Sequence, residues 1–168
     1  MKGEVSMNIQ GTLSDESIES IIGHYSQMVY RLAFARVGNK YDADEVFQEV
    51  FLRYVRKNPK FSDEEHRKAW LIKVTVNCSK TLMSSMWYSK TQELDEALAI
   101  EDENDINLYY ELQKLPAKYR EVIHLFYYED MSVEQISNVL GRKCSTVRTQ
   151  LTRARAMLKD FMKEEDYV

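Results

Sequence analysis

The stretch from Met131 to Leu158 reads MSVEQISNVLGRKCSTVRTQLTRARAML, and its signals decide the fold of this part of the chain. Ser132 and Gln135 form a Ser-x-x-Gln capping box, in which each side chain bonds the backbone N–H of the other residue, so a helix is predicted to begin here. Gly141 follows where a left-handed C-cap is needed. Between these signals, four apolar residues fall on one face at helical spacing: Val133, Ile136, Val139 and Leu140.

A second helix is predicted to begin near Ser145 or Thr146. Its buried stripe consists of four apolar residues spaced four, three and four apart: Val147, Leu151, Ala154 and Leu158. From Gly141 to Lys163 there are seven Lys or Arg residues and one acid, in a chain of net charge −4. Two short helices joined by a tight turn, the second with a basic free face, are typical of a DNA-reading helix-turn-helix. The alternative is an ordinary helical hairpin, but a solvated face usually mixes charge signs, whereas a face of one sign favours phosphates.

The composition favours a globular helical protein. Of the 168 residues 44% are hydrophobic, and only five are glycine and two proline. No apolar run approaches the roughly 20 residues of a membrane span, and the N-terminus lacks the apolar core of a secretory signal. Cys78 and Cys144 have no metal-ligand spacing and are expected to be reduced thiols in a cytoplasmic protein. Since the sequence contains no local catalytic motif and no phosphate-binding loop, we expect no cofactor, no metal and no enzyme activity.

Three helices are predicted in the N-terminal half. After a mobile leader of residues 1–13, the first helix starts at a Ser14 cap with Glu16 in its first turn. The second starts around Asp42, as DADEVFQEVFLRYVRKN, and stops before Pro59. Acids gather toward its N-terminal half and bases toward its C-terminal end, an order that compensation of the helix dipole is enough to explain.

The third predicted helix, EEHRKAWLIKVTVNCSKTLMSSMW, starts at Glu64 and belongs to a basic region. Between Arg53 and Lys90 there are nine Lys or Arg residues and three acids. An aromatic ring, basic side chains and an amide suit unstacked single-stranded bases, and Trp70 and Asn77 would supply the ring and the amide. The alternative is that Trp70 belongs to the core and Asn77 is an exposed helix residue.

The composition then becomes acidic. Between Lys90 and Lys114 there are eight acids and no basic residue, which predicts an acidic linker over residues 91–104. Helix is predicted to resume near Asp105 and, with Pro116 at the first position of the next helix, to continue as AKYREVIHLFYYE. The expected core face of that helix is Val122, Ile123, Phe126 and Tyr127. The prediction is therefore an all-α fold of two small helical domains joined by an acidic linker, the C-terminal one a helix-turn-helix four-helix domain.

Three motifs together resemble the extracytoplasmic-function (ECF) subfamily of the sigma-70 family, the sigma factors of bacterial RNA polymerase. They are DADEVFQEVFLRYVRK, AWLIKVTVNCSK and LPAKYREVIHLFYYEDMSVEQISNVLGRKCSTVRTQLTRARAML. The resemblance implies sigma region 2 over residues 14–90, sigma region 4 over residues 105–163 and a tail of residues 164–168. It implies a protein that binds core polymerase and directs promoter-specific initiation at −10 and −35 elements. A stand-alone helix-turn-helix regulator would explain the third motif but leave the first two without a role.

The resemblance also implies which residues do what. Five residues match the family's docking positions for the coiled coil of the largest polymerase subunit: Asp44, Glu45, Gln48, Glu49 and Phe51. At the −10 element, Asn77 matches the asparagine near a flipped base, with three supporting residues, Trp70, Lys73 and Lys80. At the −35 element, the candidates for reading bases or contacting phosphate are Arg142, Lys143, Ser145, Thr146, Arg148, Thr149, Gln150, Thr152, Arg153 and Arg155.

The partners that follow from the resemblance are core RNA polymerase, through its largest-subunit coiled coil and its flap, promoter DNA and an anti-sigma protein. No membrane insertion is expected. The sequence departs from the family in one notable place: many relatives carry a run of arginines after the −10 helix, whereas this chain has Met83-Ser84-Ser85-Met86-Trp87-Tyr88-Ser89-Lys90. That difference removes phosphate-binding charge from this end of the domain.

Overall fold

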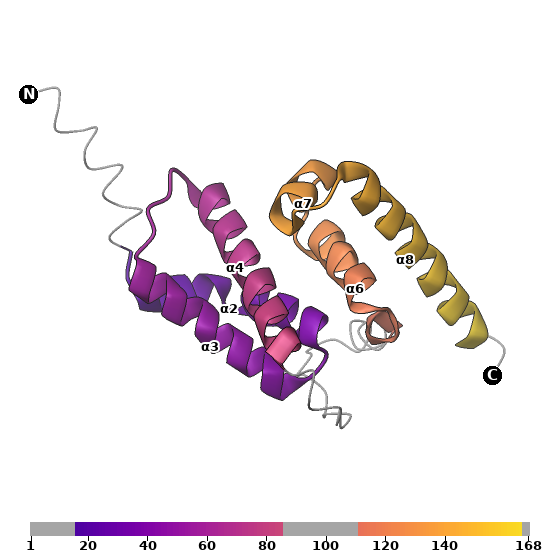
Figure 1. The fold of residues 1–168 in the computed structure, drawn as a ribbon, viewed down its shortest axis with the longest axis horizontal. Coiled ribbons are helices and arrows are strands. Elements are labelled where there is room, and N and C mark those ends of the chain that lie inside the picture. The colour runs from indigo at the N-terminus through magenta and orange to yellow at the C-terminus, as the bar shows by residue number, and fades with distance from the viewer. Residues whose placement is uncertain (1–15, 86–110, 166–168) are drawn as a thin grey trace, which may run out of the picture.

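The structure, a computed structural model, describes residues 16–85 and 111–165, and these residues form helices and short turns only (Figure 1). The N-terminal block contains α2 (Ile18–Val37), α3 (Lys40–Lys57) and α4 (Glu64–Ser85). The C-terminal block contains α6 (Ala117–Ile123), the π-helical turn η2 (His124–Tyr128), α7 (Val133–Leu140) and α8 (Cys144–Glu165). The predicted all-α class is confirmed. The predicted leader of residues 1–13, the linker of residues 91–104 and the helix start near Asp105 lie outside the described residues.

Helix α2 begins later than predicted. Its N-cap is Ser17, whose hydroxyl accepts a hydrogen bond of 3.2 Å from the backbone N–H of Ser20. The predicted cap at Ser14 is therefore wrong, and Glu16 precedes the helix instead of lying in its first turn. The physical reason lies in the tertiary structure, because the Glu16 carboxylate accepts a hydrogen bond of 2.7 Å from the guanidinium of Arg67 in α4.

Helix α3 begins at Lys40, where Asn39 caps it by accepting a 2.9 Å hydrogen bond from the backbone N–H of Asp42. It ends at Lys57, and its C-cap Asn58, with a left-handed φ of 41°, closes the helix just before Pro59, as predicted. The helices α2, α3 and α4 pack around one apolar core, whose buried members are Ile21, Tyr25, Val29, Ala33, Phe34, Val37, Ala43, Val46, Val50, Phe51, Leu71 and Cys78.

The helix-turn-helix forms as the sequence predicts. The Ser132 and Gln135 side chains bond each other's backbone N–H groups at 3.1 and 2.8 Å, which confirms the capping box. Gly141 is the C-cap of α7 with φ of 65°, a conformation that costs glycine little because it has no Cβ. The predicted stripe of α8 is buried at its first three positions, Val147, Leu151 and Ala154, and packs on α6 and α7.

The turn η2 changes the expected register of the preceding helix. The backbone N–H of Glu129 bonds the carbonyl of His124 at 3.3 Å, an i→i+5 contact that inserts one residue into the helical turn. Leu125 therefore takes the core position and is fully buried, while Tyr127 is 53% exposed. The prediction that Tyr127 belongs to the core is wrong for this reason. Pro116 is also one position off, since it is the N-cap of α6 and not its first residue.

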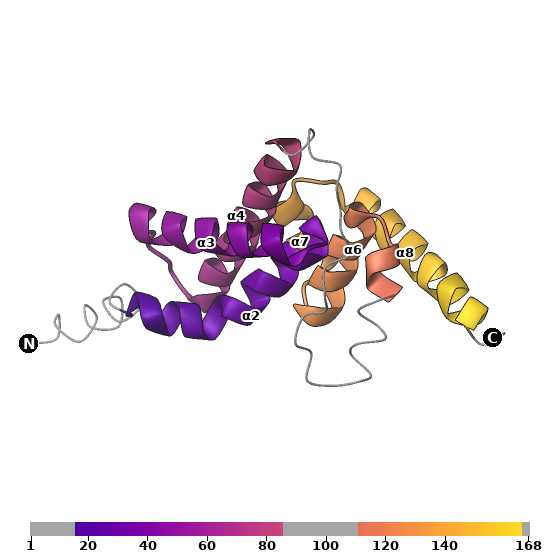
Figure 2. The same cartoon turned by 90° about the horizontal axis from the view of Figure 1, so that it is seen from below.

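The two helical blocks pack against each other. Figures 1 and 2 show α4 beside α7 and the C-terminal end of α2 beside α6, and these pairs of helices are in contact. Leu32, Ile72 and Val76 of the N-terminal block join the apolar core of the C-terminal block. At the end of α2, Gly38 adopts a left-handed φ of 80°, and a Cβ there would lie 3.8 Å from the Arg120 guanidinium of α6. The described chain is thus one closed body with two cores.

Candidate polymerase and nucleic-acid interfaces

One exposed face of α3 carries most of the predicted docking residues. Five exposed residues on this helix are spaced four, three, four and three apart, and so form a single stripe: Tyr41, Glu45, Gln48, Leu52 and Val55. The predicted Asp44 and Glu49 flank this stripe and are partly exposed. The predicted Phe51 instead lies in the core of the block, where it can only support the helix from beneath.

The chemistry of this face is mixed acidic and apolar. Burial and the neighbouring Asp44 carboxylate raise the pKa of Tyr30 to about 12. The Glu49 carboxylate accepts a hydrogen bond of 2.7 Å from Arg53 one turn later. The side chains of Leu52 and Val55 are 47% and 57% exposed. They place apolar surface in contact with solvent on this face of α3. Sequence reasoning missed both, although their spacing from Gln48 was a usable signal.

A second face lies on α4 and collects the residues predicted for the −10 element. Trp70, Lys73, Asn77 and Lys80 are spaced three, four and three apart, which places them on one side of the helix. Lys73, Asn77 and Lys80 are exposed. Trp70 is half-buried, with its ring edge-on to Tyr54 at 5.7 Å and to Phe61 at 5.9 Å between centroids. Packing is thus the evident role of Trp70, while the other three side chains face solvent.

A third face is presented by α8 and the turn before it. Eight of the ten residues predicted for the −35 element are exposed on this helix or directly before it: Lys143, Ser145, Thr146, Arg148, Thr149, Thr152, Arg153 and Arg155. Of these, Arg155 donates a hydrogen bond to the Tyr127 hydroxyl of η2. Gln150 is half-buried and accepts a hydrogen bond of 3.0 Å from Arg142. Exposure, positive charge and short polar side chains together make this face suitable for duplex DNA.

At the start of α8 the surface forms a pocket of about 250 Å³ that suits an anion. It is lined by residues of both α6 and α8: Lys118, Tyr119, Ser145, Thr146, Thr149, Gln150 and Arg153. The unsatisfied N–H groups of a helix N-terminus, hydroxyls and two cations are together the chemistry that binds phosphate. Sequence reasoning missed Lys118, because its place beside α8 depends on how α6 packs.

Between the blocks, Glu121 is completely buried and forms ion pairs with Arg36 of α2 and with Arg142, which follows α7. Burial, together with the nearby Arg142 and Arg120, lowers the pKa of Arg36 to about 10. Burial, and then the charges of Arg36 and Arg142, also lowers the pKa of Lys80. The charges of Lys80, predicted for the −10 element, and of Arg142, predicted for the −35 element, therefore lie near enough to repel each other.

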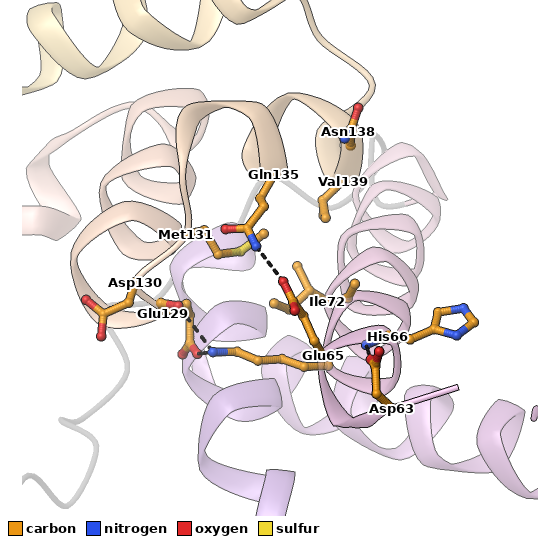
Figure 3. Close-up of a pocket in the computed structure, with 12 residues that line it drawn as sticks. Asp63, Glu65, His66, Ile72, Glu129, Asp130, Met131, Gln135, Asn138 and Val139 are labelled. Atoms are coloured by element: carbon orange, nitrogen blue, oxygen red, sulfur yellow. Dashed lines mark hydrogen bonds and ion pairs between the residues drawn. The ribbon is translucent and has the colours of Figure 1, made fainter. Parts of the chain in front are cut away.

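A cleft of about 550 Å³ lies between the start of α4 and the η2–α7 segment (Figure 3). Two pairs of residues make polar contacts across it: Gln135 donates to Glu65 at 2.9 Å, and Lys68 pairs with the Glu129 carboxylate at 3.3 Å and donates to its backbone carbonyl at 3.2 Å. The Glu129 carboxylate also lies 3.6 Å from the His124 ring. Burial alone would raise the pKa of Glu129, but His124 and Lys68 outweigh burial and hold it below its ordinary value. The contact between the blocks is therefore apolar at its centre and ionic at both sides.

Comparison with known families accounts for both blocks. Residues 21–87 match the model of sigma-70 region 2, and residues 106–158 match that of sigma-70 region 4. The chain belongs to the sigma-70 family and is a sigma factor of the ECF type. It directs transcription initiation through RNA polymerase, and, as in this family generally, it is not an enzyme. The stand-alone regulator is thereby ruled out, because it leaves the region 2 match unexplained.

Individual relatives agree with the family match. The chain is 28% identical over 159 residues to the ECF RNA polymerase sigma factor SigE of Mycolicibacterium smegmatis, covering 87% of this chain and 62% of that protein. It is 28% identical over 151 residues to the RNA polymerase sigma factor SigV of Bacillus subtilis, covering 86% and 90%. Its fold resembles the sigma factor RpoE of Bartonella quintana, solved with the anti-sigma factor NepR, with a TM-score of 0.69, 19% identity and coverage of 86% and 96%.

Across residues 16–85 and 111–165, no helix is both long enough and apolar enough to span a membrane.

Proposed function

We propose that the three exposed faces divide the work of initiation among them. The face of α3 docks on the coiled coil of the largest polymerase subunit, the face of α4 engages the −10 element, and the face of α8 binds the −35 element. One observation supports this division: most residues of each predicted set are exposed or partly exposed on their own helix or directly before it, while the core-facing residues between them are buried. Region 2 is proposed to span residues 14–90, and region 4 residues 105–163.

At the polymerase, Glu45 and Gln48 supply the polar contacts and Leu52 and Val55 the apolar ones. Exposed apolar residues at helical spacing suit a partner helix, which a coiled coil presents along its length. Asp44 and Glu49 border the contact, where they favour a basic partner and raise the association rate more than the affinity. Phe51 supports the docking face from within the core.

At the −10 element, Asn77 would bond a base that has left the stack, and Lys73 and Lys80 would hold the flanking backbone. Flipping a base out of a duplex costs a few kcal/mol, least where the strand is already melted. Because Trp70 is packed against Tyr54 and Phe61, it would stiffen the α4 face rather than stack on the base.

At the −35 element, Arg148, Thr149, Gln150 and Thr152 would lie in the major groove, and Lys143, Arg153 and Arg155 would bind the backbone. Ser145 and Thr146, with the free N–H groups of the α8 start and with Lys118, form a further phosphate site. Arg142 reaches DNA only after leaving Glu121. The closed arrangement would therefore open when the chain binds core polymerase in the cytoplasm.

Three further partners belong to this proposal. The polymerase flap would hold region 4, the acidic residues of the linker over 91–104 would run along a basic channel of the enzyme, and an anti-sigma protein would keep the factor inactive. The anti-sigma partner is supported by the structure of RpoE of Bartonella quintana, which was solved with the anti-sigma factor NepR.

The experiment that tests the division combines core binding and run-off transcription. Gln48→Ala should weaken the one-to-one complex with core polymerase but leave the −35 contact of the assembled holoenzyme unchanged. Arg148→Ala should leave core binding intact and weaken promoter binding by about 1–3 kcal/mol if that side chain reads a base. Arg31→Ala, at an exposed arginine of α2 that belongs to none of the three faces, is the control for loss of charge. The reverse pattern of effects would refute the assignment.

A further inference from the structure

The end of the α8 face holds an arginine in an unusual setting. Arg155 lies about three turns after the start of α8 at Cys144. It is on the same side of the helix as Arg148 and Thr152, because the three residues are spaced four and three apart. Its Nε donates a hydrogen bond of 2.7 Å to the Tyr127 hydroxyl. Its guanidinium carbon lies 5.3 Å from the centroid of the Phe126 ring and 5.6 Å from that of Tyr127. Two aromatic rings and one hydroxyl therefore fix the plane of this guanidinium.

The two terminal nitrogens of Arg155 are suited to bind an anion. Among the described residues no carboxylate pairs with Arg155, whereas five other arginines, Arg36, Arg53, Arg67, Arg142 and Arg148, each pair with a glutamate. With Nε engaged, the two terminal nitrogens stay available as a fork, which is the geometry that binds phosphate in bidentate fashion. A guanidinium held by aromatic faces also loses less side-chain entropy when it binds.

The position of Tyr127 depends on the π-helical turn. In an uninterrupted α-helix, the residue at this place would point to the core, as the apolar spacing predicts. The bond from the Glu129 N–H to the His124 carbonyl and the burial of Leu125 rotate Tyr127 outward, to 53% exposure. The phenol thereby reaches α8, with its ring edge-on to Phe126 at 5.0 Å between centroids. A π turn of this kind often marks a functional position.

We propose that Tyr127, assisted by Phe126, is a positioning residue that holds Arg155 for a backbone phosphate of the −35 duplex. This inference rests on the proposed binding of the −35 element by α8. It extends the DNA face beyond the helix-turn-helix to η2, and it gives the π-helical turn a role. Tyr127 does not read a base, so it changes affinity but not promoter sequence preference.

The test uses the reconstituted holoenzyme and a fluorescent promoter duplex, selected from random sequence with the wild-type holoenzyme. Affinity is measured over roughly 50 to 200 mM salt, where each phosphate contact adds about 0.9 to the slope of log K against log salt. Arg155→Ala should lower affinity about tenfold and the slope by about 1. Tyr127→Phe should lower affinity roughly threefold, with the slope kept, because the charge remains. The double variant should bind no more weakly than Arg155→Ala alone.

Matched variants separate positioning from stability. The neighbouring Tyr128 stacks its ring on His124. Tyr128→Phe removes a phenol hydroxyl beside Tyr127 and should leave promoter affinity unchanged. Arg155→Lys should keep the salt slope but lose affinity about as Tyr127→Phe does, because lysine has no planar fork. The inference is overturned if Tyr127→Phe and Arg155→Ala lower the melting temperature but not the affinity, or if their effects on affinity add.

Arg148→Ala distinguishes a failure of the proposed −35 face of α8 from a failure of the role proposed for Tyr127. If Arg148→Ala weakens promoter binding and Arg155→Ala does not, the −35 assignment of α8 stands and only the role of Tyr127 falls. If neither variant affects promoter binding, the proposed DNA face of α8 itself is wrong.

Discussion

Arg36 of α2 and Glu121 of α6 form a buried ion pair across the boundary between regions 2 and 4. Glu121 has no exposed surface and also pairs with Arg142. Breaking a buried pair by removing one partner usually costs far more than an exposed pair contributes, because it leaves an uncompensated charge. The stability of the closed arrangement is therefore expected to depend on this carboxylate.

Glu121→Gln should open the molecule. The variant leaves two arginines without their counter-charge and is expected to destabilise the closed form by about 3 kcal/mol. Small-angle X-ray scattering should show a larger radius of gyration than that of the wild type. Glu19→Gln, an exposed acid in the first turn of α2, should leave the radius unchanged. An unchanged radius for Glu121→Gln, with folding preserved, would show that the apolar contacts alone keep the regions together.

The pH dependence of the free energy of unfolding should reveal the lowered pKa of Glu129. Its folded-state pKa is lowered, so it contributes stability above the ordinary carboxyl value of 4.5 that is lost as the pH falls through the lowered folded value. Urea unfolding of the wild type should therefore lose more stability on acidification below pH 4.5 than that of Glu129→Gln. Other carboxylates titrate in both proteins, so the difference between the two curves isolates Glu129. Parallel curves would contradict the assigned contact with His124 and Lys68.

Two glycine substitutions should change stability in opposite directions. Gly141→Ala should destabilise the helix-turn-helix by about 1 kcal/mol, because φ of 65° disfavours any residue with a Cβ. Gly23→Ala, on the exposed side of α2, should stabilise the protein by up to about 1 kcal/mol, because alanine is the better helix former. A Cβ at either position meets no atom within 4 Å, so backbone conformation alone decides the sign. Thermal unfolding measures both.

Leu52→Asp should weaken binding to core polymerase without unfolding the chain. Leu52 is 47% exposed on α3, so the substitution removes apolar contact surface and adds no buried charge to the free protein. We expect a loss of about 2 kcal/mol in core affinity, near the value of burying one leucine side chain. Met162→Asp, at an apolar residue near the end of α8 that is 57% exposed, is the control. Equal losses for the two variants would argue against a specific docking face.

The sequence by itself determined the local structure of this protein. Capping rules act within about four residues, and they correctly located the start of α7, its end at Gly141 and the stripe Val147–Leu151–Ala154. Helical spacing alone also brought the docking residues of α3 and the exposed polar residues of α4 to one side of their helices. The three motifs were enough to indicate the sigma-70 family, since they are read in order along the chain.

Only the tertiary structure decided how distant residues are used. Glu16 lies outside α2, where its carboxylate accepts a hydrogen bond from Arg67, 51 residues away, and the N-cap of the helix is Ser17. Tyr127 points outward because Leu125 fills the core and forces a π turn, which apolar spacing cannot reveal. In the sequence Glu121 is one acid among many, and its burial between Arg36 and Arg142 follows from the packing of two regions. Burial and long-range charge pairing depend on which surfaces meet, and local sequence rules carry no information about that.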